Sequence, residues 1–474
     1  MERLNRIGSI RPRHASQVAS SQLGIGFEKL DRNVFDPSKA YDKIAALGVK
    51  WVRLQSGWAR TEKEKGVYDF QWLDEIVRNL HGKGMQPWIC LCYGNGLYTP
   101  EANKYFGAVG CPPINSQEAL SAWQAYVSAL VSRYRDQVSC YEVWNEPDGA
   151  WCWKHGPSGS EYGQFVAATA QAVRRANPEA RVFGGSVYAG SLGFLQEAMQ
   201  AGMAESIDAL TFHCYTTSEE DLRHRTQALR ALCDSYSPNI ALIQGESGSQ
   251  SDSRGAGALR GAAWTPLRQA KQQLRHAVGD LINGVEFSSY FSSMDMIEAL
   301  NGLTGDKSSY QDYGYFGVLG ADFDEDGFAS GEYTPKPSYY AYQNLAALLA
   351  DSPKVSHLPY LMQKGSSPRV LGQDYLDYRL FATGFAREGS SALCYWHPAE
   401  LLTQTFESTI SLEIAGQPAP IRLVDPMDGA VYALPDSMVE QLGHGCVLLR
   451  HLPIRDYPLF LCFGDFVAFD PTGK

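Results

Sequence analysis

Hydrophobic residues are arranged in two different ways along the chain, and the change falls near residue 351. Between residues 22 and 348, short apolar runs alternate with longer segments in which apolar residues recur every three or four positions. Short apolar runs are typical of buried parallel strands, and the longer periodicity is typical of amphipathic helices that cover them. Beyond residue 351 the apolar runs stay short and are separated by turn residues, which indicates antiparallel strands.

The first region contains eight strand–helix units. The expected strands are 23–26, 51–54, 86–92, 138–143, 180–184, 207–212, 239–244 and 285–287. The expected helices are 37–47, 70–81, 116–134, 159–176, 191–201, 218–235, 266–282 and 337–349. Eight units in alternation predict an α/β fold, a closed (β/α)8 TIM barrel over residues 21–350. An open doubly wound sheet is the alternative, but the segment 24–29 (Gly-Ile-Gly-Phe-Glu-Lys) lacks the GxGxxG loop typical of that fold.

The second region, residues 354–474, predicts an accessory antiparallel β-sandwich. Its expected strands are 378–385, 392–396, 409–414, 421–424 and 459–463. Residues 1–20 are a candidate for a further strand of this domain.

Composition narrows the classes of function. The chain has 474 residues, of which 44% are hydrophobic and 20% charged, and its net charge is −11. This acidic balance argues against nucleic acid or an anionic membrane as a partner. The N-terminal residues lack the apolar stretch of a secretory signal, so we expect a cytoplasmic protein unless a signal peptide has been removed. The ten cysteines are scattered, and several of them, such as Cys140, Cys214 and Cys462, lie in apolar strands and are interpreted as buried free thiols. The oligomeric state is left open.

Two glutamates stand directly after expected strands. Glu146 lies in the tetrad 144–147 (Trp-Asn-Glu-Pro) at the end of strand four, and Glu246 lies at the end of strand seven. Side chains at the carboxyl ends of barrel strands point into the mouth where barrel enzymes carry out chemistry. A glutamate before a proline can also simply solvate a turn. The full tetrad after a buried strand, together with a second strand-end glutamate, favours the paired carboxylates of glycoside hydrolysis.

The octad 141–148 (Tyr-Glu-Val-Trp-Asn-Glu-Pro-Asp) resembles the acid/base strand of glycoside hydrolase family 39, a member of clan A. The resemblance implies that Glu146 is the general acid/base, that Asn145 binds the sugar 2-hydroxyl and that Glu246 is the nucleophile. Segment 212–215 (Phe-His-Cys-Tyr) matches the clan's strand-six pattern, which implies that His213 and Tyr215 lie beside the nucleophile.

Arg53, at the end of strand two, matches a basic residue of the clan that often contacts the nucleophile. Arg53 pairing with Glu142 inside the barrel, and His213 as an ordinary core residue, are the alternatives.

Two features depart from the family pattern. Gly245 precedes the expected nucleophile, where the family commonly has threonine. The tryptophan that often forms the floor of the −1 subsite at strand eight is missing, so Tyr290 or Phe291 is expected to supply that aromatic surface.

Tryptophans that follow strands are further candidates for sugar platforms. We expect Trp58, Trp151 and Trp153 to contact substrate, with residues 148–155 as the wall of a subsite. Packing beneath the loops is the alternative for some of them.

These patterns together predict a retaining glycosidase that cleaves an equatorial (β-type) bond, acts on chain ends of small glycosides and needs no cofactor or metal. An endo-acting glycanase of the same clan and a non-catalytic carbohydrate-binding barrel are the alternatives. A metal-dependent hydrolase is disfavoured because strand ends carry no His-x-His or His/Asp cluster. The acidic segment 322–327 imitates the start of a calcium loop, but Tyr333 stands at its twelfth position.

Overall fold

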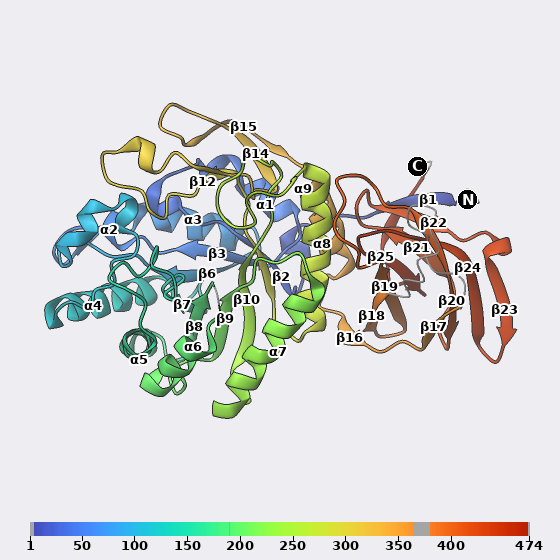
Figure 1. Cartoon of the computed structure of the whole chain (residues 1–474), viewed down its shortest axis with the longest axis horizontal. Coiled ribbons are helices and arrows are strands. Elements are labelled where there is room, and N and C mark those ends of the chain that lie inside the picture. The colour runs from blue at the N-terminus through green and yellow to red at the C-terminus, as the bar shows by residue number, and fades with distance from the viewer. Residues whose placement is uncertain (1–3, 189, 364–379, 473–474) are drawn as a thin grey trace.

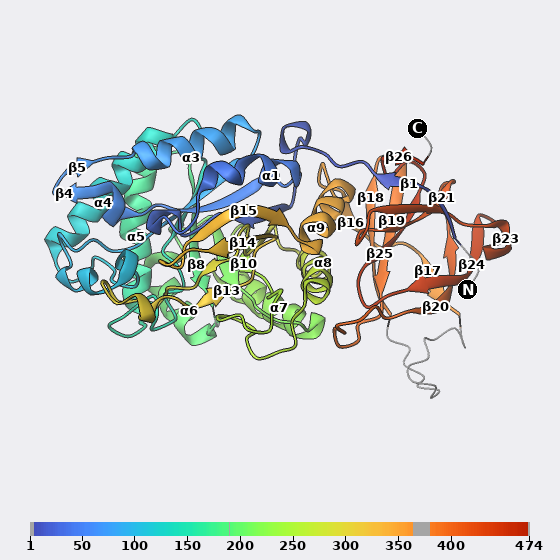
Figure 2. The ribbon, with the colours of Figure 1, turned by 90° about the horizontal axis from the view of Figure 1, so that it is seen from above.

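The computed structural model describes residues 4–188, 190–363 and 380–472. The chain forms two bodies side by side, a barrel surrounded by helices and a body of antiparallel strands (Figure 1). Helices α8 and α9 lie between them in both views (Figures 1 and 2). The predicted combination of a TIM barrel with antiparallel sheets in the C-terminal region is therefore confirmed.

The barrel is a closed parallel sheet of eight strands in the order β10-β11-β2-β3-β6-β7-β8-β9. Its strands are β2 (Leu23–Gly26), β3 (Trp51–Gln55), β6 (Gln86–Leu91), β7 (Cys140–Val143), β8 (Arg181–Val187), β9 (Ala209–His213), β10 (Ala241–Ser247) and β11 (Ser288–Tyr290). Its principal helices are α1 (Tyr41–Ala46), α3 (Gln71–Gly82), α4 (Gln117–Tyr134), α5 (Gly159–Ala176), α6 (Leu192–Ala198), α7 (Glu219–Tyr236), α8 (Pro266–Ile282) and α9 (Pro337–Leu348).

Side-chain caps fix where several of these helices begin. Ser116, Ser158 and Ser218 each accept a backbone N–H three residues ahead, at the start of α4, α5 and α7. Thr265 does the same for α8, with Pro266 as its first residue. Each cap stabilises its helix by about 1 kcal/mol, and together the caps set the lengths of the strand-to-helix loops that carry the site.

The eighth strand lies three residues later than the sequence predicts. Val285 and Phe287 were expected in this strand, but the ladder begins at Ser288, which pairs with Leu23. Phe287 instead stacks on Trp51, with ring centroids 4.6 Å apart, and belongs to a cluster in the lower barrel interior. The large ring of Phe287 fills this layer of the barrel interior, and the strand that follows begins with the small residues Ser288 and Ser289.

Between β11 and α9 the chain makes two small antiparallel ladders that the sequence pattern does not predict. Strand β12 (Met296–Ile297) pairs with β13 (Tyr313–Gly314), and β14 (Leu319–Phe323) pairs with β15 (Ala329–Pro335). The acidic segment 322–327 comprises the last two residues of β14 and most of the turn of the second hairpin. Asp324 accepts the N–H groups of Asp326 and Phe328, so its carboxylate already stabilises that turn.

A helix and a further hairpin on the barrel were also not predicted. They are α2 (Trp58–Thr61), β4 (Glu62–Glu64) and β5 (Val67–Tyr68). All three lie between β3 and α3 in the chain.

The second body contains two antiparallel sheets. The larger comprises, in order, β16 (Lys354–Ser356), β18 (Phe381–Arg387), β19 (Ser390–Trp396), β25 (Leu459–Phe463), β21 (Ile421–Asp425), β22 (Ala430–Ala433), β1 (Asn5–Ile10) and β26 (Phe469–Pro471). The smaller comprises β17 (Tyr360–Met362), β20 (Ser408–Ala415), β24 (Cys446–Ile454) and β23 (Val439–Gly443). Strand β1 thus joins the chain start to the C-terminal sheets (Figure 2). Residues 378 and 379 of one expected strand lie outside the described residues, and the division at residues 350–354 stays a prediction.

A buried ion pair joins the two bodies. The Lys271 ammonium on α8 lies 2.8 Å from the Asp456 carboxylate, and both side chains are fully buried. Lys271 also donates to the carbonyls of Leu402 and Gln404. Removing one partner of such a pair leaves an uncompensated charge, so this contact restricts how the bodies sit together. Within the described residues, no helix is both long and apolar enough to span a bilayer.

Candidate active site

Glu146 is presented by a strained turn at the end of β7. Trp144 and Glu146 both have left-handed backbone angles, with φ of 69° and 46°. Each costs about 1–2 kcal/mol for a residue other than glycine. The surroundings hold this conformation: Trp144 is fully buried, its indole N–H donates to the Cys152 carbonyl at 2.7 Å, and the Glu146 N–H donates to the Ser186 carbonyl. The turn directs the Glu146 carboxyl into the barrel mouth.

Glu246 lies near the end of β10, where the ladder with β9 shifts register and pairs Glu246 with His213. The structure explains why glycine stands at position 245, directly before Glu246. A Cβ at this position would lie 3.3 Å from both the Glu142 Oε1 and the His213 Nε2 atoms. Glycine therefore leaves room for two buried polar side chains that flank the nucleophile candidate.

His213 lies between the two glutamates. Its Nδ1 atom is 3.0 Å from Glu146 Oε1 and 3.5 Å from Glu246 Oε2. One oxygen of each carboxyl group and a ring nitrogen of His213 all lie within 4.8 Å of one another. On the other side of the ring, Nε2 lies 3.3 Å from the Ser186 hydroxyl. The strand ends of β7, β9 and β10 thus bring the expected pair and His213 together.

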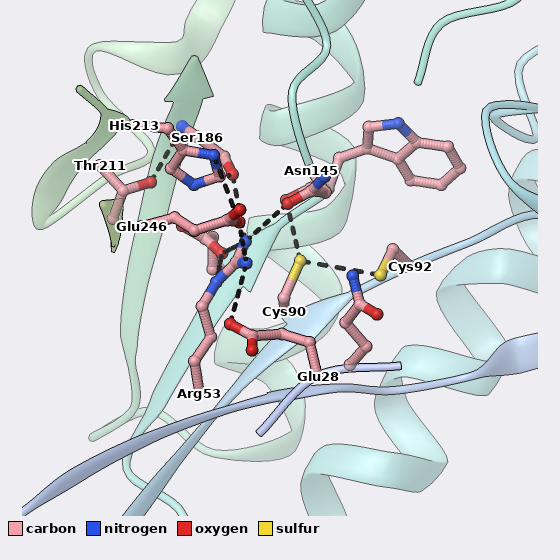
Figure 3. Close-up of polar contacts among 12 residues, drawn as sticks. Glu28, Arg53, Cys90, Cys92, Asn145, Ser186, Thr211, His213 and Glu246 are labelled. Carbon is pink, nitrogen blue, oxygen red and sulfur yellow. Dashed lines mark hydrogen bonds and ion pairs between the residues drawn. The ribbon is translucent and has the colours of Figure 1, made fainter. Parts of the chain in front are cut away.

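The surroundings of Glu246 favour its ionised form. Arg53 donates from Nη1 to Glu246 Oε2 at 2.9 Å (Figure 3). The Tyr215 hydroxyl donates to Glu246 Oε1 at 2.6 Å. Burial acts to raise the pKa of Glu246. The charges of His213 and Arg53 and the hydrogen bond from Tyr215 outweigh the effect of burial, so the pKa is lowered.

The surroundings of Glu146 favour its protonated form. Burial raises the pKa of this carboxyl group, and the neighbouring His213 offsets only part of that effect. The Trp151 indole N–H donates to Glu146 Oε2. Two carboxyl groups in one site therefore have pKa values shifted in opposite directions, the condition for one acid and one nucleophile.

Arg53 is buried beneath Glu146 and Glu246 and donates hydrogen bonds to several side chains. Besides Glu246, its guanidinium donates to Asn145 Oδ1 at 2.9 Å and to Glu28 Oε1 at 3.4 Å (Figure 3). It also donates to Glu142 Oε2 at 2.9 Å. The contact with the nucleophile candidate and the pairing with Glu142 are thus both present. Because the Arg53 side chain has no exposed surface and does not line the cavity, we correct its expected role from substrate contact to a group that acts through Glu246.

The glutamates face one cavity of about 480 Å³. Of the residues expected from the sequence, it is lined by Asn145, Glu146, Trp151, Tyr215 and Glu246. His213 contacts both glutamates but is not part of the lining. This volume is on the scale of small-ligand pockets, roughly 300–1,000 Å³.

Three expected sugar contacts lie elsewhere. Trp58 and Trp153 have no exposed surface: Trp58 stacks on Tyr98, with centroids 5.4 Å apart, and Trp153 packs edge-on against Trp144. The Tyr290 hydroxyl donates to the backbone carbonyls of Ser249 and Phe316, away from the cavity. We correct these three residues to packing roles.

Phe291, the second aromatic candidate at strand eight, does line the cavity. The eighth strand lies later in the chain than expected, which explains why Phe291 faces the site and Tyr290 does not.

Several cavity residues were not anticipated. Glu28 and Lys29 lie two and three residues after the end of β2, so the strand-end rule that identifies Glu146 would have found them. Glu298 lies after β12, and Tyr188 follows β8. Burial raises the pKa of Glu28 and that of Glu298 to about 7. Glu298 had no sequence signal because the insertion that carries it was not predicted.

The glutamates and His213 are also residue types that bind metal ions. Their atoms are already engaged: His213 lies against both carboxyl groups, and the Arg53 guanidinium supplies positive charge to Glu246. A divalent cation there would face this guanidinium at close range, so the donor set is better matched to proton transfer than to metal binding.

Comparisons with known proteins match the geometry. The model of glycosyl hydrolases family 39 matches residues 38–225, a segment that includes β3 and Glu146. A beta-galactosidase, BgaA, from Clostridium cellulovorans is 28% identical over 149 residues, which cover 28% of this chain and 22% of that protein. A beta-xylosidase from Geobacillus stearothermophilus is 23% identical over 163 residues, which cover 32% of each. The chain thus matches less than a third of the length of these curated relatives.

Solved structures share the fold over nearly the whole chain. The family 39 enzyme from Xanthomonas axonopodis pv. citri superposes with a TM-score of 0.62 and 18% identity, covering 94% of this chain and 95% of that one. A monomeric beta-xylosidase from Caulobacter crescentus gives a TM-score of 0.61 and 17% identity, covering 96% and 97%. The matched segment and the shared fold make this chain similar to the glycoside hydrolases of family 39, which belong to clan A.

Proposed function

We propose that the protein is a retaining glycosidase that cleaves an equatorial (β-type) glycosidic bond by double displacement, with Glu246 as nucleophile and Glu146 as acid/base. One observation supports this most strongly: the two carboxyl groups face one cavity with pKa values shifted in opposite directions. A non-catalytic binding barrel has no need of such a pair.

The proposed reaction has two steps. In the first, a Glu246 carboxylate oxygen attacks the anomeric carbon while Glu146 gives its proton to the departing glycosidic oxygen, leaving a glycosyl ester on Glu246. In the second, ionised Glu146 takes a proton from water, and the resulting oxygen attacks the anomeric carbon and releases Glu246. Arg53 and Tyr215 keep Glu246 ionised before attack and after release.

The separation of the carboxyl groups supports retention of configuration. One oxygen of Glu146 lies within 4.8 Å of one oxygen of Glu246. Retaining sites hold their carboxyl groups about 5–5.5 Å apart, and inverting sites about 6.5–9.5 Å apart to admit a water molecule.

A charged group beside the pair supports binding of a terminal sugar. Lys29 Nζ lies 3.7 Å from Glu298 Oε1 and donates to the Ile297 carbonyl, so it has further protons to donate. Glu298 Oε1 is buried and accepts no hydrogen bond. A neighbouring donor and acceptor suit two adjacent sugar hydroxyls, and we propose that this end of the cavity holds a non-reducing terminal residue. The names of the curated relatives favour a β-linked galactose- or xylose-type sugar.

The test is a screen of aryl β-glycosides with different sugars, followed by proton NMR of the first-formed product of the best substrate. Initial release of the β-anomer supports double displacement. Initial release of the α-anomer would make Glu246 a general base and refute the covalent step. Exo action is tested separately on a soluble polysaccharide, where viscosity loss ahead of monosaccharide release would show internal cleavage.

A further inference from the structure

The residues that line the catalytic cavity differ in chemistry on the two sides of the glutamate pair. On one side Glu28, Lys29 and Glu298 follow β2 and β12, and their side chains are charged or ionisable. On the other side Trp151 and Tyr188 follow β7 and β8 and present aromatic rings. In the closed barrel β2 and β11 are neighbours, and so are β7 and β8. The charged cluster, which also has the Phe291 ring against Lys29, and the pair Trp151 and Tyr188 therefore occupy different sectors of the barrel mouth.

The aromatic side is the side of the leaving group. The Trp151 indole N–H donates to Glu146 Oε2, and the ring of Tyr188 packs edge-on against Trp151 with centroids 5.3 Å apart. Under the proposed function Glu146 faces the glycosidic oxygen, because it gives that oxygen a proton. The group beyond this oxygen, the aglycone, then lies beside Trp151 and Tyr188.

Tyr188 also lines a second hollow of about 320 Å³, which shares this residue with the cavity and lies beside the start of α6 and the N-terminal part of α7. Its lining includes the buried side chains of Val187, Phe212 and Leu229. At its rim Leu192 is 48% exposed and Tyr188 is 37% exposed, unusually high for large apolar side chains beside a site.

The charged residues of the hollow leave its apolar lining available. Asp221 and Arg225, one turn apart on α7, pair with each other at 3.0 Å. Their charges are thus already matched, and the rest of the lining is mainly apolar, with His213 and His224 beside the aliphatic and aromatic side chains.

We propose that this second hollow is an aglycone subsite that selects glycosides with an apolar alkyl or aryl leaving group, as opposed to a second sugar. The inference rests on the proposed function and adds the chemical class of the leaving group. An alkyl or aryl group that passes Trp151 reaches Tyr188 and Leu192, and it loses water-exposed surface there. Each methylene that becomes fully buried raises affinity for the transition state about fourfold.

The experiment measures kcat/KM for straight-chain alkyl glycosides from methyl to hexyl, built on the sugar that the aryl screen identifies. The alcohols of this series leave with similar intrinsic ease, so a rise with chain length reports binding of the aglycone. We expect an increase of about two- to fourfold per carbon over the first several carbons.

Matched variants place the effect on this surface. Leu192→Ser is expected to lower the hexyl-to-methyl ratio of kcat/KM about five- to tenfold, because it removes the exposed aliphatic side chain of the rim. Leu361→Ser is the control, since Leu361 is 66% exposed on β17 of the sandwich, and it should leave the ratio unchanged. Tyr188→Ala should also lower the ratio, and Tyr188→Phe should preserve it because the ring remains.

The outcomes separate the two claims. Failure to hydrolyse any glycoside would overturn the proposed function, and this inference with it. Hydrolysis with a flat dependence on chain length would leave the proposed function intact and overturn the aglycone subsite. A steep dependence that Leu192→Ser and Tyr188→Ala leave unchanged would also overturn it, because the apolar group would then bind elsewhere.

Discussion

Replacing Tyr215 by phenylalanine removes a single hydroxyl group from the site and keeps the ring. That hydroxyl donates to Glu246 Oε1 at 2.6 Å, and the ring packs edge-on against Phe316 with centroids 5.9 Å apart. The ring is therefore held independently of the hydrogen bond. The substitution should remove one stabilising contact of the ionised nucleophile and leave the site otherwise in place.

The expected effect follows from the strength of that bond. A hydrogen bond to a charged acceptor contributes about 1.5–3 kcal/mol, and one pKa unit corresponds to about 1.36 kcal/mol. The pKa of Glu246 is lowered in the wild type, and loss of the donor should raise it by about one to two units. Under the proposed mechanism Glu246 reacts in its ionised form, so the acidic limb of the pH profile should move to higher pH by the same amount.

The assay is kcat/KM against pH on an aryl glycoside, which reports the ionisation of the free enzyme. Tyr290→Phe is the matched control, because its hydroxyl donates to the carbonyls of Ser249 and Phe316 and touches neither glutamate. That variant should lose some thermal stability and keep the wild-type acidic limb. An unchanged acidic limb in a folded Tyr215→Phe variant would refute the assignment of Glu246 as the ionised nucleophile.

Three further perturbations test the other groups. Glu146→Gln should abolish the alkaline limb of the profile for substrates with good leaving groups; the wild-type limb should lie above the usual glutamate pKa because burial raises that of Glu146, and persistence of the limb would assign it to another group. Arg53→Met should destabilise the fold by about 3–5 kcal/mol in denaturant titrations, because it leaves buried Glu142 uncompensated; a loss under 1 kcal/mol would contradict this role of Arg53. Exhaustive chelation should leave the rate unchanged, since the proposed steps use proton transfer and covalent attack; a loss that calcium alone restores would assign a structural ion.

Much of the barrel was predictable because it rests on local signals. The expected helices 116–134, 159–176 and 218–235 begin at a serine or directly after one, and in the structure the side chains of Ser116, Ser158 and Ser218 cap these helices. The predicted position of the eighth strand was wrong by three residues. Periodicity cannot distinguish a strand residue from an aromatic residue such as Phe287 that fills the barrel interior just before the strand.

The site was predictable where a residue lies at the end of a buried strand or just after it, and poorly predictable elsewhere. Glu146 and Glu246 satisfy that rule and face one cavity. The roles of tryptophans in loops could not be predicted in this way, because an indole ring packs as well beneath a loop as against a sugar. Trp58 is buried, whereas Trp151 lines the cavity. The strand-end rule could not identify Glu298, because this residue belongs to an insertion after the eighth barrel strand.

The central claim is that Glu246 forms a covalent bond with the sugar. The most direct measurement is mass-spectrometric peptide mapping after incubation with a 2-deoxy-2-fluoro glycoside that carries a good leaving group, built on the sugar found in the screen. Fluorine at C2 slows both steps, and the good leaving group keeps the first step fast enough for the ester to accumulate. We predict a stoichiometric label on the peptide that contains Glu246 and its absence in Glu246→Gln. A stoichiometric label on a different residue, or turnover of the reagent without any label, would contradict the account.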